Sequence, residues 1–73
     1  MSAATDYAAC QVVVTKMLDA MRDARERITC GDWASLAYEA RQLEALSRLL
    51  SAAAWRVHEW DCEERGVATG ERP

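Results

Sequence analysis

The fold is decided by residues 32–62, which read DWASLAYEARQLEALSRLLSAAAWRVHEWDC. This stretch contains neither proline nor glycine, and its apolar residues recur at intervals of three, four or seven, which is typical of one face of an α-helix. A helix of this length extends for about 45 Å at roughly 1.5 Å per residue, so it needs an equally long partner. The repeating positions are Leu36, Leu43, Leu46, Leu50, Ala53, Val57 and Trp60.

Residues 6–29 carry a second pattern of the same kind and are predicted to form that partner helix. Val12, Val13 and Val14 are β-branched and would favour a strand in a short segment. The periodic pattern continues through Ile28 without a break, however, and this length favours a helix. Val12 and Val13 lie outside the stripe that is expected to face the second helix. That stripe consists of Tyr7, Cys10, Val14, Met17, Met21, Ala24 and Ile28.

Gly31 and Asp32 predict a tight turn between the two helices. Glycine readily adopts the left-handed backbone conformation that ends many helices. An aspartate can begin the next helix by accepting a hydrogen bond from the amide of Ala34 or Ser35. A connection this short forces the two helices to run antiparallel.

These signals together predict an all-α fold. The expected architecture is an antiparallel two-helix hairpin, with helices at about residues 6–29 and 32–63, that dimerises into a four-helix bundle. The hairpin domain spans residues 1–62. From residue 63 the sequence becomes rich in charge and glycine, which predicts a flexible polar C-terminal tail over residues 63–73.

Length and charge argue against several classes of function. A chain of 73 residues removes only about 60% of its accessible surface from water on folding, so we expect further burial against a second chain. The net charge of −3 argues against nucleic-acid binding, which relies on a basic surface. No apolar run approaches the roughly 18 residues that a membrane-spanning helix needs, so no membrane association is expected. Three cysteines without a CxxC pair favour reduced thiols and a cytoplasmic location.

The second helix carries more apolar surface than one partner helix can cover. A further apolar stripe is rotated away from the first, and folding the chain at Gly31 places its densest part, residues 49–55, opposite the apolar residues 8–14. The open end of the hairpin is therefore the predicted association surface. Trp55 is its expected anchor, because buried tryptophans often dominate binding energy. The predicted interface residues are Val12, Val13, Tyr38, Leu49, Ala52 and Trp55.

These features predict a non-enzymatic protein-protein interaction module that pairs with itself as a homodimer. The alternative is a small accessory or inhibitory factor, of phage or antitoxin type, that binds a different cellular protein through the same surface. A DNA-binding regulator would need its arginines to converge on one surface, and the interspersed acidic residues argue against it. The arginines concerned are Arg22, Arg25, Arg41 and Arg48. The sequence contains no recognisable catalytic constellation or cofactor motif, so neither an enzymatic activity nor a cofactor is expected.

One pair of residues has metal-ligand chemistry. His58 and Cys62 stand four residues apart on one helical face, with Glu59 and Asp61 nearby, which is half of a zinc site. Structural zinc needs four ligands, so a twofold axis would have to bring two such faces together. The chain lacks a second ligand pair of its own, and the sequence therefore predicts no metal site.

Overall fold

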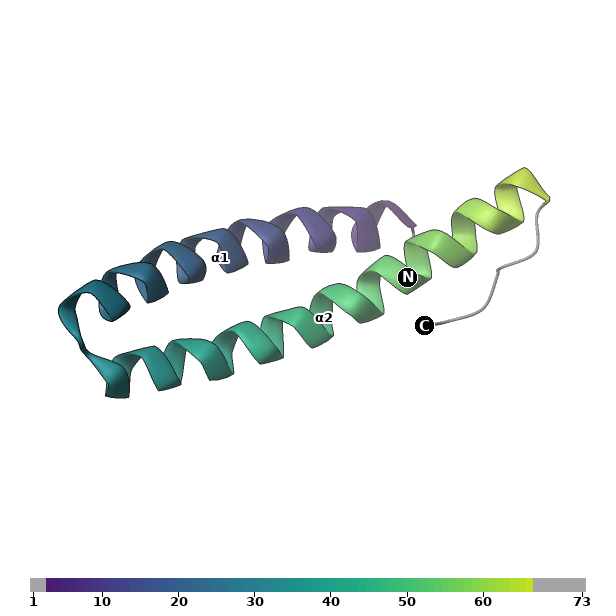
Figure 1. Ribbon diagram of the computed structural model, residues 1–73. Helices are drawn as coiled ribbons and strands as arrows, with labels where there is room; N and C mark the ends of the chain where they lie inside the picture. Colours follow the sequence, from purple (N-terminus) through teal and green to yellow (C-terminus); the bar gives the residue numbers. More distant parts are fainter. Residues whose placement is uncertain (1–2, 67–73) are drawn as a thin grey trace.

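The computed structural model describes residues 3–66, which form two α-helices joined by a short turn (Figure 1). Helix α1 spans Ala3–Cys30 and helix α2 spans Trp33–Arg65. The helices run antiparallel, and α2 continues past the beginning of α1 at the open end (Figure 1). The predicted all-α hairpin is confirmed, and both helices are slightly longer than the sequence pattern indicated. Within the described residues, neither helix is long and apolar enough to cross a membrane.

The turn is closed by two backbone hydrogen bonds at the end of α1. Gly31 has a φ of +72°, and its N–H donates to the carbonyl of Ile28 at 3.1 Å. The N–H of Asp32 donates to the carbonyl of Arg27 at 2.9 Å. This pair of bonds is the Schellman motif, which ends a helix at a left-handed residue and satisfies two of its last carbonyls.

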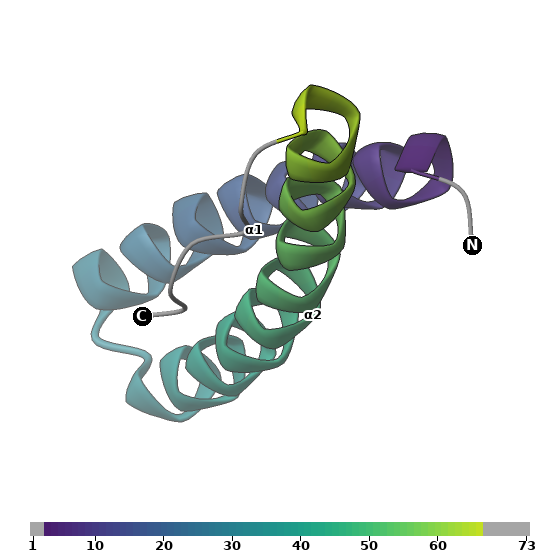
Figure 2. The ribbon, with the colours of Figure 1, turned by 90° about the vertical axis from the view of Figure 1, so that its right-hand side faces the viewer.

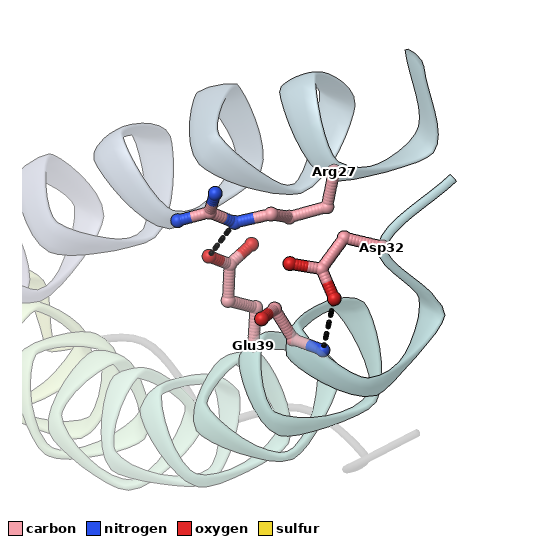
Figure 3. Close-up of polar contacts among 4 residues, drawn as sticks. Arg27, Asp32 and Glu39 are labelled. Atoms are coloured by element: carbon pink, nitrogen blue, oxygen red, sulfur yellow. Dashed lines mark hydrogen bonds and ion pairs between the residues drawn. The ribbon is translucent and has the colours of Figure 1, made fainter. Parts of the chain in front are cut away.

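Asp32 also begins α2. Its carboxylate accepts a hydrogen bond from the N–H of Ser35 at 3.2 Å (Figure 3). Hydrogen bonding by Ser35, through its hydroxyl first and its amide second, lowers the pKa of Asp32 below the ordinary value. The stop and start signals predicted at Gly31 and Asp32 are therefore confirmed.

Helix α2 ends at Gly66, a second glycine in the left-handed region with a φ of +69°. Its N–H donates to the carbonyls of Cys62 and Glu63, so the last turn of the helix is capped. The predicted helix ended at about residue 63, and the structure extends it through residues 64 and 65, which were expected in the flexible tail, to this cap. The rest of the predicted tail, residues 67–73, lies outside the described residues.

On α2 the seam between the helices uses the face that the sequence predicted. Ala53 is only 2% exposed, and Val57 is half-buried. Trp60 is the exception, since 47% of it is exposed. It lines a shallow hollow with Ala4 and Tyr7, at the level where α1 is only beginning, so α1 is too short to cover it. The other half-buried seam residues are Leu36, Leu43, Leu46 and Leu50.

On α1 the inward face differs from the predicted one. Tyr7, Val14, Met21 and Ile28 were expected in the seam but are 41–59% exposed, whereas Val13 is buried at 9%. The inward face of α1 is rotated by about one residue relative to the predicted stripe. Viewed from the open end, the two helices are inclined to each other (Figure 2). The least exposed residues of α1 are Asp6, Ala9, Cys10, Val13, Met17, Ala20, Ala24 and Arg27.

Two ion pairs cross the seam in this orientation. Near the open end, the buried Asp6 accepts a hydrogen bond from Arg56 at 2.8 Å between Oδ1 and Nε. Near the turn, Arg27 donates to Glu39 at 3.4 Å between Nε and Oε1 (Figure 3). In this orientation each carboxylate has an arginine partner across the seam, which offsets the cost of removing Asp6 from water.

The middle of the seam is lined by small residues on α1. Ala20 and Ala24 lie between the two ion pairs and allow the α2 leucines to approach the α1 backbone closely. The inward face of α1 therefore combines charged and small residues with Val13 and Met17, and the other large apolar residues remain outside the seam.

Candidate interaction surface

The hairpin leaves most of its large apolar side chains uncovered. Among the described residues, no large side chain is completely buried. Two helices can cover only one stripe of each other, and both helices here carry apolar residues over more than one stripe. Contiguous apolar surface of this kind on a small protein marks an interaction site. The exposed large apolar residues are Tyr7, Val12, Val14, Leu18, Met21, Ile28, Trp33, Tyr38, Leu49 and Trp60.

The exposed residues divide between the two broad sides of the hairpin. On one side, which we call the apolar side, Met17 and Met21 of α1 line a hollow together with Ala40, Leu43 and Ser47 of α2. On the opposite side, the charged side, the corresponding hollow is lined by Lys16, Asp19, Ala20 and Asp23 of α1 and by Gln42, Ala45 and Leu46 of α2. The same pair of helices therefore presents two different chemistries.

The apolar side carries a row of large residues on α1. Tyr7, Val14, Met21 and Ile28 stand seven residues apart, a spacing that keeps them on one stripe of a packed helix. Leu18, which is 62% exposed, lies beside this stripe. We refer to the four residues at sevenfold spacing as the large row.

The facing part of α2 carries a row of small residues. Ala40, Ser47 and Ala54 also stand seven residues apart, and all three are exposed. Ala40 and Ser47 line the same hollow as Met21, which places this row beside the large row on the apolar side. We refer to these three residues as the small row. The polar lining of this hollow is limited to Glu44, Ser47 and Arg48.

Most of the interface residues predicted from the sequence lie on the charged side. Residues seven apart lie on the same stripe of a packed helix. By this spacing Val12 shares a stripe with Asp19, Leu49 with Gln42, and Tyr38 and Ala52 with Ala45. Asp19, Gln42 and Ala45 all line the charged hollow. All four are exposed.

Val13 and Trp55 lie elsewhere. Val13 is buried within the hairpin, so it does not contribute to the free surface. Trp55 is half-buried on α2 and meets the ring of His58 edge to face, with 5.3 Å between the ring centroids. It lines a hollow with Ser51, Ala54 and His58, at the outer edge of the small row.

The large row was missed by sequence reasoning because the same residues were assigned to the intrachain seam. The sevenfold spacing of Tyr7, Val14, Met21 and Ile28 was visible in the sequence. The available signal was the pairing of charges: with this row turned inward, Asp6 and Arg27 would not reach Arg56 and Glu39 across the seam.

The His58 and Cys62 pair has the geometry of two neighbouring side chains on one helix. The Sγ atom of the buried Cys62 lies 3.7 Å from Nε2 and 3.9 Å from Nδ1 of His58. Across the part of the chain that the structure describes, no three histidine, cysteine or acidic residues gather in a group that could hold a metal ion. One hairpin therefore offers at most two zinc ligands at this place.

Two of the four arginines that DNA binding would need have an acidic residue beside them. Arg22 pairs with Asp19 at 2.7 Å on the outside of α1. Arg48 lies on α2 and lines the apolar hollow together with Glu44.

Comparisons with known proteins give no assignment: no family model, no curated protein and no solved structure matches this chain. The surface chemistry of the hairpin is therefore the basis for a functional proposal.

Proposed function

We propose that this protein is a non-enzymatic interaction module that associates with a second copy of itself and forms a four-helix bundle. The observation that carries the proposal is the large row on α1, whose four apolar residues lie on one stripe of the helix and are 41–59% exposed. A second hairpin laid against this stripe would convert two half-covered helices into a bundle with an apolar centre.

The energetic gain from such an association is substantial. Full burial of one large apolar side chain contributes about 1.5–3 kcal/mol, and each residue of the large row still exposes roughly half of its surface. A twofold-symmetric dimer would bury two copies of every residue at the interface. This surface is therefore an unused source of stability in the hairpin.

A cytoplasmic location is part of this proposal. Cys10, Cys30 and Cys62 are all free thiols, and Cys30 is exposed beside the turn. Free thiols of this kind persist in a reducing compartment.

The mass of the purified protein in solution tests the proposal. Light scattering over a range of concentrations should give twice the chain mass of 8.2 kDa, and dilution should reduce both the mass and the helical circular dichroism signal. A fully helical species that stays at 8.2 kDa at high concentration would contradict the proposal.

A second candidate function has one specific observation in its favour. Val12, Tyr38, Leu49 and Ala52 are exposed on the charged side, which a dimer formed through the apolar side leaves open. An accessory or inhibitory factor that binds a different protein could use these residues. A chain that remains monomeric and poorly helical alone, but becomes helical on adding a defined partner protein, would support this candidate over self-association.

A further inference from the structure

We propose that two copies pair through their apolar sides about a twofold axis parallel to the helices, so that the large row of each copy packs onto the small row of the other. This inference rests on the proposed self-association and adds the face and the relative direction of the two copies. Both rows lie on the same side of a single hairpin, and this makes the side complementary to itself.

The register within one hairpin sets the level of each row. Met21 lines one hollow with Ala40 and Ser47, so its level along the hairpin lies between these two small residues. Tyr7 lines a hollow with Val57, which is three residues beyond Ala54. The two rows therefore alternate along the long direction of the molecule.

A twofold axis parallel to the helices preserves these levels. It exchanges the two helices when the second copy is laid face to face, so that α1 of one copy lies over α2 of the other and runs antiparallel to it. Met21 of the second copy then faces the gap between Ala40 and Ser47. Val14 faces the gap between Ser47 and Ala54 in the same way, which is the knobs-into-holes geometry of packed helices, and Tyr7 and Ile28 lie beyond the two ends of the small row.

The other twofold arrangement fits less well. An axis perpendicular to the helices would place α1 over α1, with large residues against large residues, and α2 over α2, with small residues against small residues. The first contact would be overpacked and the second would contain voids, and both defects are destabilising. Alternation of large and small side chains across an interface avoids both.

The dimensions of the hairpin match the area that a stable dimer requires. Its longest extents are 51 and 23 Å, so a broad side has an outline of about 51 × 23, or roughly 1,200 Å². A standard stable interface buries about 800 Å² on each partner. This outline is the upper limit of the area that one broad side can bury, and it exceeds what a standard dimer requires.

The charged side is disfavoured as the face for a second copy. Docking there would remove Lys16, Asp19 and Asp23 from water, with the opposing copy supplying the same set of groups. Charges transferred from water without well-placed partners oppose association. The hollow on the apolar side is lined by two charged residues, Glu44 and Arg48, which are opposite in sign, against three on the charged side, so a contact there removes fewer charges from water.

Matched substitutions on the two sides test the face. Met21→Glu on the apolar side should raise the dimer dissociation constant by about 100-fold or more, because two carboxylates would enter the apolar centre of the interface. Leu49→Glu on the charged side has a similar initial exposure and should leave the dissociation constant within about threefold of the original.

Ser47→Trp gives an independent test that adds bulk and no charge. Ser47 is exposed in the single hairpin, so the substitution should not disturb folding, but it should block the partner's large row and weaken dimerisation. Gln42→Trp on the charged side is its control. Equal effects of the substitutions on both sides, or stronger effects on the charged side, would overturn the choice of face.

The distance between the two turns tests the direction of the axis. A nitroxide label can be attached to Cys30 alone in a Cys10→Ala chain, because Cys62 is buried. The distance between the labels of the two copies should be under about 30 Å, because both turns lie at one end of the dimer and neighbouring helix axes are about 8–10 Å apart. Turns at opposite ends would be separated by about the length of α1, roughly 42 Å for 28 residues.

The outcomes separate the two proposals. Absence of a dimer in the unmodified protein contradicts the proposed function itself. A dimer with a long distance between turns, or one that resists both Met21→Glu and Ser47→Trp, keeps the function and overturns the arrangement.

Discussion

The two ends of the hairpin are held together in different ways. The four buried residues among those described are Asp6, Val13, Ala53 and Cys62, and all lie in the half remote from the turn. The open end also has the shorter ion pair, at 2.8 Å between Asp6 and Arg56. At the turn end the Arg27 and Glu39 pair is longer, at 3.4 Å, and its carboxylate is more exposed than that of Asp6, at 16% against 5%.

This difference follows from the covalent connection. The turn keeps α1 and α2 close at one end through two backbone hydrogen bonds and the cap at Asp32, so little packing is needed there. The free end has no such connection, and the entropy of separating the helices must be opposed by burial and charge pairing. The open end is therefore the part of the hairpin whose stability depends most on side chains.

The largest expected effect comes from breaking the ion pair at the open end. Arg56→Ala leaves the carboxylate of Asp6 buried without its partner and should lower the free energy of unfolding by about 2 kcal/mol. This loss is smaller than that for a fully buried ion pair, because Arg56 is itself 45% exposed. Urea denaturation followed by circular dichroism, at one fixed protein concentration, measures the change.

Two variants serve as controls for this comparison of the ends. Arg56→Lys keeps the charge and should recover part of the loss. Arg27→Ala removes the corresponding arginine at the turn end and should cost less, because the turn still holds the helices together. Glu39, which has one buried carboxylate oxygen without a hydrogen-bond partner in the described structure, can then turn toward solvent. A larger loss from Arg27→Ala than from Arg56→Ala would contradict the comparison.

A smaller effect is expected from the turn itself. Gly31→Ala places a side chain on a residue with a φ of +72°, and since nothing lies within 4 Å of the added Cβ, the penalty is purely conformational, about 1 kcal/mol. Gly31→Asn should lose less, because asparagine adopts the left-handed conformation more readily. Thermal melting of the three proteins measures the order. An alanine variant as stable as the original would contradict the left-handed turn.

The smallest expected effect is a pH dependence at Asp32. Hydrogen bonds from Ser35 lower the pKa of this carboxyl in the folded state. The carboxylate therefore contributes to stability above the unfolded pKa of about 3.9, and this contribution is lost as the pH falls through the folded pKa. The Tm of the original protein should exceed that of Asp32→Ala at pH 7, and the difference should shrink on acidification below about pH 4. A difference that grows in acid would contradict the capping role.

Several features of the fold were predictable from single residues. Gly31 and Asp32 specified where α1 ends and α2 begins, because few residues other than glycine tolerate a positive φ and because an aspartate side chain can replace a missing helical carbonyl. The inward face of α2 was predictable because its leucines leave one dominant stripe. Of the candidate surface, the exposure of Val12, Tyr38, Leu49 and Ala52 followed from the sequence, but the apolar side did not.

The sequence by itself determined two long helices, their turn and their antiparallel direction, since these depend on local periodicity and on one short connection. The tertiary structure alone decided which face of α1 turns inward. Two overlapping stripes share Cys10, Met17 and Ala24, and both satisfy helical spacing. Only contact with α2 separates them, because the stripe with Asp6 and Arg27 finds opposite charges across the seam, and this choice leaves the large apolar row exposed.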